Sequence, residues 1–164
     1  MYSDLSGKFP VQSAGGALYY VSLIDEKIRY AWIRFLRTKD QASKALKAMI
    51  SEAERQTGRK LKAIRTDNAG EYLAIDDFLK QQGAIHEWTP PYSHESNKLP
   101  ERFNRTIYTM ARSMLAGTKL PRFLWAEALN TATYVKNRLP HQGLERGTTS
   151  YKAFHGTKPS IEHL

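Results

Sequence analysis

Residues 18–36, LYYVSLIDEKIRYAWIRFL, contain the two strongest strand signals of the chain. The run from Leu18 to Ile24 is rich in β-branched and aromatic residues and is almost entirely apolar, which is typical of a central strand. Residues 25–29 interrupt this run, and the run from Tyr30 to Leu36 is a second strong strand signal. The two runs together predict a β-hairpin.

The segments around this hairpin alternate between strand and helix patterns. Strands are predicted at residues 2–5, 61–66 and 84–88, and helices at residues 40–57, 76–82, 99–115 and 121–138. Gly117 is expected to end the third helix, and Pro121 is expected to open the fourth. This order predicts an α/β fold, a mixed sheet with helices on both faces. We expect residues 1–140 to form one core, with residues 141–164 as its turn-rich C-terminal extension.

The composition bounds the class of protein. The 164 residues include 25 Lys and Arg against 16 Asp and Glu, a net charge of +9, and this favours a polyanionic partner such as nucleic acid. A basic but otherwise ordinary protein is the alternative that charge alone leaves open. The absence of cysteine excludes disulfides, thiol catalysis and cysteine zinc sites. No signal peptide or long apolar run is visible, so we expect neither secretion nor a membrane partner.

Three acidic residues are placed where an α/β fold can bring them together. Asp4 lies in the first predicted strand, Asp67 directly follows the strand at residues 61–66, and Glu101 lies in the first turn of a long helix. Magnesium prefers hard oxygen ligands, and two such ions about 4 Å apart can clamp the oxygens of a phosphodiester. The sequence permits this cluster without demonstrating it.

The helix that carries Glu101 has a polar stripe on the same side. Asn104, Arg105, Tyr108 and Arg112 follow Glu101 at helical spacing, opposite the apolar stripe. Such a stripe is suited to DNA phosphates. The spacing alone, however, favours an ordinary solvated helix face.

Two sequence blocks carry a family resemblance. RTDNAGEY (residues 65–72), followed by PYSHESNKLPERFNRT (residues 91–106), resembles the catalytic core of copia-type LTR retrotransposon integrases. Other segments agree in the same order along nearly the whole chain, including SDLSGKFPVQSAGG, YYVSLIDEKIRYAW, ARSML, LPRFLWAEALNTATYVKNRLP and SYKAFHGTKPSIEHL.

The resemblance implies a ribonuclease-H-like fold with a mixed five-stranded sheet and helices on both faces. It implies that Asp4, Asp67 and Glu101 are the catalytic and metal-binding residues, with two Mg²⁺ or Mn²⁺ ions present with substrate. Asp25, which also follows a strong strand, is expected to be only a turn residue that hydrogen-bonds nearby backbone. The nucleic-acid-binding residues implied are Asn68, Tyr92, Asn97, Lys98, Arg102, Arg105 and Arg112.

The resemblance also implies the activity and the partners. The activity would be 3′-end processing and strand transfer on double-stranded DNA, both the element ends and the target. The chain would act as a homodimer or higher oligomer, in the nucleus after a cytoplasmic particle stage. Phe123, Leu124 and Trp125 are interface candidates, although core positions explain them more simply. We expect no zinc in this fragment, because the N-terminal zinc module and a C-terminal DNA-binding domain are both missing from it.

Four departures from the family pattern keep two alternatives open. The spacing from Asp67 to Glu101 is short by two residues, Ala69 and Lys98 stand where glycine is usual, and Pro100 directly precedes Glu101. A ribonuclease-H-like nuclease that cuts without joining would use the same acids. A decayed, non-catalytic DNA-binding or assembly domain would not need them.

Overall fold

A mixed sheet forms the centre of the molecule. The computed structural model describes residues 1–67, 70–89, 98–160 and 162. Within them, five strands pair in the order β3-β2-β1-β4-β5, antiparallel from β1 to β3 and parallel from β1 through β4 to β5. The strands are β1 (Tyr2–Leu5), β2 (Tyr19–Ile24), β3 (Ala31–Leu36), β4 (Ala63–Thr66) and β5 (Ile85–Trp88). The predicted fold class and hairpin are confirmed.

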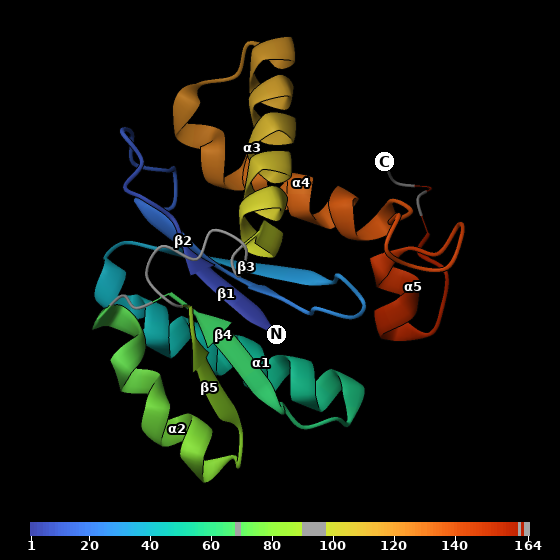
Figure 1. Ribbon diagram of the computed structural model, residues 1–164. Coiled ribbons are helices and arrows are strands. Elements are labelled where there is room, and N and C mark those ends of the chain that lie inside the picture. The colour runs from blue at the N-terminus through green and yellow to red at the C-terminus, as the bar shows by residue number, and fades with distance from the viewer. Residues whose placement is uncertain (68–69, 90–97, 161, 163–164) are drawn as a thin grey trace.

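Helices cover both faces of the sheet. The α-helices are α1 (Ala42–Thr57), α2 (Asp76–Gln81), α3 (Lys98–Thr118), α4 (Trp125–Arg138) and α5 (Ser150–His155). Short 3₁₀ segments are η1 (Lys39–Gln41), η2 (Gly70–Ile75) and η3 (Arg122–Leu124). Figure 1 shows α3 and α4 on one side of the sheet and α1 and α2 on the other. The central strands are therefore covered by helices on both faces of the sheet.

The apolar character of β2 follows from this double cover. Val21 and Leu23 belong to the core cluster on the α1 side, whereas Tyr20 and Ile24 belong to the cluster beneath α3 and α4. Successive strand residues point to opposite faces, so a strand buried on both faces has no polar side. The same alternation in β1 turns Asp4 toward α3.

The end of α3 differs from the prediction. The helix continues through Gly117 to Thr118, and Lys119 takes the left-handed backbone position with φ 54°. The Leu120 N–H donates to the Leu115 carbonyl and the Lys119 N–H donates to the Ala116 carbonyl, as in a Schellman ending. The prediction that Gly117 ends the helix was therefore wrong, because a lysine fills the usual glycine position.

The start of α4 and the C-terminal segment also differ from the expectation. Pro121 opens the 3₁₀ segment η3, and α4 itself begins at Trp125. Trp125 is buried, stacks on Phe9 with ring centroids 3.7 Å apart, and donates from its indole nitrogen to the Val11 carbonyl. It is thus a core residue, whereas Phe123 is exposed. Helix α5 in the turn-rich extension was not predicted.

Candidate active site

Two parallel strands carry the first two predicted acids to the same edge of the sheet. In the β1–β4 pair, Tyr2 lies opposite Arg65, and the Arg65 guanidinium lies 5.2 Å from the centre of the Tyr2 ring. Asp4 and Asp67 are each two residues further along, so they follow the same register. Residues in register on parallel strands point to the same side, which places both carboxylates toward α3.

Helix α3 contributes the third acid through its first turns. Asn104 donates from Nδ2 to Oδ2 of Asp4 at 2.6 Å, which fixes this part of α3 over the end of β1. Glu101 precedes Asn104 by three residues and therefore shares its side of the helix. The negative charges of both Asp67 and Glu101 act on Asp4. Asp67 and Glu101 thus both lie within electrostatic reach of Asp4.

The ionisation of Asp4 reflects this crowding. The pKa of the Asp4 carboxyl is raised from 3.8 to about 6, chiefly by burial; the charges of Asp67 and Glu101 contribute to this rise, and the Asn104 hydrogen bond opposes it. A carboxylate that is both desolvated and near like charges is stabilised by any cation that enters between them. The edge is therefore electrostatically suited to a cation.

The arrangement is not a closed metal cage. Within residues 1–67, 70–89, 98–160 and 162, no group of three or more histidine or acidic side chains is arranged to hold an ion by itself. The amide of Asn104 occupies one oxygen of Asp4, and its own Oδ1 is buried with no hydrogen-bond partner in the described part of the chain. An oxygen acceptor beside Asp4 is thus left without a donor.

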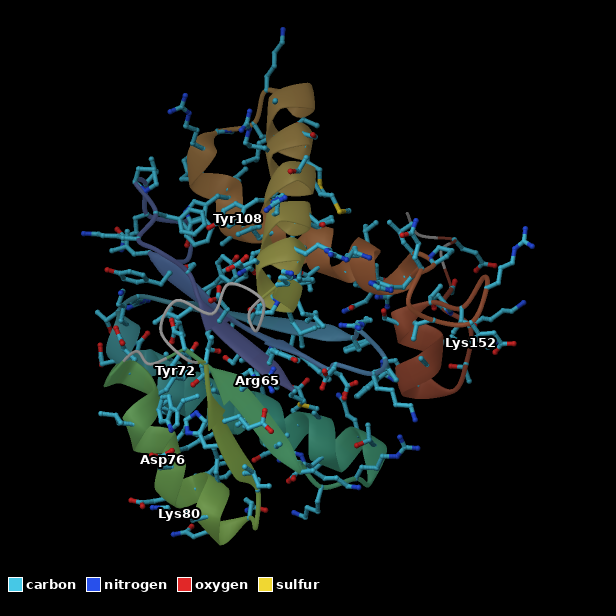
Figure 2. The ribbon with its side chains drawn as sticks, viewed as in Figure 1. Arg65, Tyr72, Asp76, Lys80, Tyr108 and Lys152 are labelled. Atoms are coloured by element: carbon cyan, nitrogen blue, oxygen red, sulfur yellow. The ribbon has the colours of Figure 1, made fainter. Side chains whose placement is uncertain are left out.

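Aromatic side chains surround the acids on both sides of β1. Figure 2 shows Tyr108 of α3 and Tyr72 of η2 on opposite sides of this strand. Tyr108 lies beside Phe9 and Tyr20 in the cluster beneath α3, with ring centroids 5.7 Å and 6.0 Å away. The buried Tyr72 hydroxyl lies 3.4 Å from Ser3 Oγ.

A chain of polar contacts that sequence reasoning missed supports the end of β4. Thr66 donates to the Asp67 carbonyl at 2.9 Å, and its hydroxyl also lies 2.9 Å from Nε2 of His86. The Nδ1 atom of His86 contacts Asp76 of α2, and its ring lies 3.9 Å from that of Trp88. His86 stands in no metal-ligand spacing, and no sequence pattern indicated this chain of contacts. It anchors the backbone that carries Asp67.

The predicted nucleic-acid-binding residues fall into three groups. Lys98 and Arg102 line a cavity at the start of α3. Arg105 and Arg112 are exposed further along α3, and Arg112 lines a separate apolar groove with Trp125. Asn68, Tyr92 and Asn97 lie outside the described residues.

The structure agrees with the interpretation of Asp25 as a turn residue. Its Oδ1 accepts hydrogen bonds from the backbone N–H groups of Lys27 and Ile28, both at 2.8 Å. These bonds close the turn between β2 and β3, so the Asp25 carboxylate serves local structure.

Comparisons with known proteins agree with this architecture. No family model matches the chain. It is 42% identical over 142 residues to the retrovirus-related Pol polyprotein from transposon TNT 1-94 of Nicotiana tabacum, covering 85% of the chain and 11% of that protein. It is 32% identical over 164 residues to the corresponding polyprotein from transposon RE2 of Arabidopsis thaliana, covering 100% of the chain and 11% of that protein. The chain belongs to the copia-type retrovirus-related Pol polyproteins.

A solved structure has a fold similar to that of this chain. The chain matches a chain of the simian T-cell lymphotropic virus intasome in complex with PP2A regulatory subunit B56 gamma, with a TM-score of 0.70 and 19% identity. The match covers 99% of this chain and 58% of the other. The fold is therefore that of an integrase-type, ribonuclease-H-like core domain, and the chain spans about a tenth of the length of its polyprotein relatives.

None of the helices in the described ranges combines the length and the apolar character that crossing a membrane requires.

Proposed function

We propose that the chain is the catalytic core of a DNA integrase, which trims the 3′ ends of the element's DNA and joins them to a target DNA. The observation that supports this most directly is the position of Asp4, which accepts a hydrogen bond from Asn104 of α3 and lies within electrostatic reach of Asp67 and Glu101. Membership of the Pol polyproteins and the integrase-type fold support it further. Copies of the chain would act together as a dimer or larger assembly on double-stranded DNA.

The residues at this edge fit Mg²⁺ or Mn²⁺. Magnesium binds through one or two carboxylates and completes its shell with waters and substrate phosphates, so a cage of three protein acids is not required. The like charges around Asp4 favour a divalent cation, and the buried Asn104 Oδ1 has no hydrogen-bond partner among the residues described. Hard oxygen donors without cysteine fit this class of metal better than zinc.

The proposed mechanism assigns a distinct role to each side chain. When bound, a pair of such ions activates the attacking oxygen and stabilises the leaving oxygen of the phosphodiester. Asp4 and Asp67 would hold the first cation site, and Glu101 would complete the second. Asn104 orients the Asp4 carboxylate through its 2.6 Å hydrogen bond. Arg105, exposed on the same helix, would hold DNA phosphate.

The Asp67→Asn variant tests this proposal. It keeps the side-chain size but removes a negative charge, so Mn²⁺-dependent strand transfer is expected to fall by roughly 100-fold or more, because changes merely next to metal ligands already cost about 10 to 100-fold. The assay follows a labelled DNA end joined to a plasmid. Asp77→Asn, an exposed acid on α2, is the matched control and should stay active. Full activity of Asp67→Asn in a folded protein would overturn the assignment.

The same assay separates joining from simple cutting. Labelled DNA joined to the plasmid appears only if the chain is a strand-transfer enzyme, whereas a nuclease yields shortened ends alone. Shortened ends without joined product would leave Asp4, Asp67 and Glu101 as the proposed catalytic residues but would change the proposed reaction from strand transfer to hydrolysis.

A non-catalytic DNA-binding domain is the second candidate function. Two observations favour it: no preformed three-acid metal group lies in the described ranges, and the Asn104 amide already engages Asp4. Calorimetric titration with Mn²⁺ distinguishes the two. Metal binding that Asp67→Asn abolishes supports the enzyme, whereas DNA binding without metal binding supports the second candidate.

A further inference from the structure

A second cavity lies on the other side of the first turns of α3. It has a volume of about 600 Å³ and is enclosed by the start of α3, the end of α4 and the segment at residues 140–143. Its apolar wall is formed by Ile24, Leu99 and Phe103, and the side chain of Thr106 also lines it. We refer to it as the basic pocket, because Arg29, Arg102, Lys136 and His141 line it together.

The charged side chains that the structure describes in the basic pocket are all basic. Burial lowers the pKa of His141, and the positive charges of Lys136, Arg29 and Arg102 lower it further, so these three cations face one imidazole. No acidic side chain among the residues that the structure describes lines the pocket. In the ranges that the structure describes, the charged groups of Arg29, Arg102 and Lys136 form no ion pair with a carboxylate. A bound anion that is not part of the chain would stabilise these grouped positive charges.

Arg29 is held in the pocket at a conformational cost. It has a left-handed backbone with φ 61°, a conformation that is unfavourable for a residue other than glycine. Its Nε is buried and has no hydrogen-bond partner among the described residues. Unsatisfied buried donors are rare in folded proteins and often indicate a missing ligand. The guanidinium thus has a free donor that an anion in the pocket would satisfy.

Two further features favour an oxyanion. Burial lowers the pKa of Lys136, which means that its ammonium is partly desolvated and gains from a charged partner. The first turn of α3, through Lys98 and Leu99, also lines the pocket, and the start of a helix carries partial positive charge. The donors therefore come from three elements and converge on one space.

We propose that the basic pocket binds a backbone phosphate of DNA, at a place distinct from the acids that meet at Asp4. The proposal rests on the proposed function in that DNA is taken as the ligand. Arg102 directly follows Glu101 in α3, so the two side chains lie on neighbouring faces of the helix. A DNA strand that reaches the acids from the start of α3 would therefore pass close to the pocket. Phosphate contacts of this kind position DNA without reading its sequence.

The test removes two positive charges from the pocket and compares this variant with a control that loses two positive charges elsewhere on the surface. The pocket variant is Arg29→Asn with Lys136→Gln, since asparagine tolerates the left-handed backbone. The control is Lys80→Gln with Lys152→Gln, two exposed lysines on α2 and α5 that lie far apart from one another in Figure 2. Binding of a fluorescein-labelled DNA duplex is measured by anisotropy in EDTA at several salt concentrations, so catalysis plays no part.

The expected result is a loss of DNA affinity of about ten-fold in the pocket variant, with a salt slope smaller by about 1–2 because each phosphate contact contributes roughly 0.9. The control should stay within about two-fold of the original chain, and both variants should melt at similar temperatures. Equal affinity of the pocket variant and the control overturns the proposal.

Titration with inorganic phosphate, followed by the amide NMR signals of residues 141–143, distinguishes the source of the anion. One outcome would overturn the DNA assignment: phosphate shifts these signals in the original chain, but the pocket variant binds DNA as tightly as the original chain does. The pocket would then be a site for a small anion. A chain that binds DNA through the pocket but gives no strand transfer would count against the proposed function alone.

Discussion

Helix α3 carries the two proposed functional regions, which have opposite charge and lie on adjacent faces. Glu101 and Asn104 face the acids at the end of β1, whereas Leu99, Arg102 and Thr106 line the basic pocket. A buried stripe, Phe103, Ile107 and Ala111, occupies the remaining side. Neighbouring residues of one helix can therefore serve chemistry and binding separately, because each residue along the helix turns the side-chain direction by about 100°.

The largest expected effect comes from separating these two roles at adjacent positions. Glu101→Gln should lower strand-transfer rate by roughly 100-fold or more while leaving DNA affinity unchanged, since even substitutions outside a metal's ligand set cost about 10 to 100-fold. Arg102→Ala should instead weaken DNA binding several-fold with a near-normal rate at saturating DNA. Single-turnover kinetics across a DNA concentration series measures both quantities.

Arg102→Lys is the control for that pair, because it keeps the charge while changing the geometry. If Glu101→Gln and Arg102→Ala impaired rate and affinity in the same proportion, the two faces of α3 would not be functionally distinct.

A smaller effect is expected on stability at the acidic edge. The pKa of Asp4 is raised from 3.8 to about 6, so in the metal-free protein its ionised form opposes folding above pH 6. Asp4→Asn is therefore expected to be more stable near pH 7 by about 3 kcal/mol, since one pKa unit corresponds to about 1.4 kcal/mol. Denaturant unfolding in EDTA measures this difference.

The sign of this effect makes it specific. A raised carboxyl pKa means that the folded chain binds the proton more tightly, so the original chain gains stability as the pH falls from about 6 toward 3.8. The advantage of Asp4→Asn should shrink over that range, and Mn²⁺ should stabilise only the original chain. A difference that does not vary with pH would contradict the crowding of the three acids.

Sequence reasoning reached the acidic edge but not the basic pocket, and the reason is physical. Strong strand patterns place β2 and β3, and Asp67 directly follows a strand, so the sequence permitted three acids at one sheet edge, and the family resemblance named them. Arg29, Arg102, Lys136 and His141 come from a turn, two helices and a loop, and no periodicity links them. Helix α5 was missed because its six residues are held partly by packing of Phe154 on Tyr30 and Trp32.

The smallest effect concerns the ionisation of His141 in the basic pocket. The Gly143 N–H donates to Nδ1 of His141 at 3.0 Å, which requires an unprotonated nitrogen, and burial together with nearby cations lowers the pKa below 6.5. NMR titration should find that low pKa, and Arg29→Asn with Lys136→Gln should move it back toward 6.5. Because a lowered histidine pKa removes stability as pH falls below 6.5, the original chain should lose more stability on acidification than this variant. An unchanged His141 pKa in the variant would mean that these cations do not share one space, and the contrast between the two faces of α3 would then rest on the acids alone.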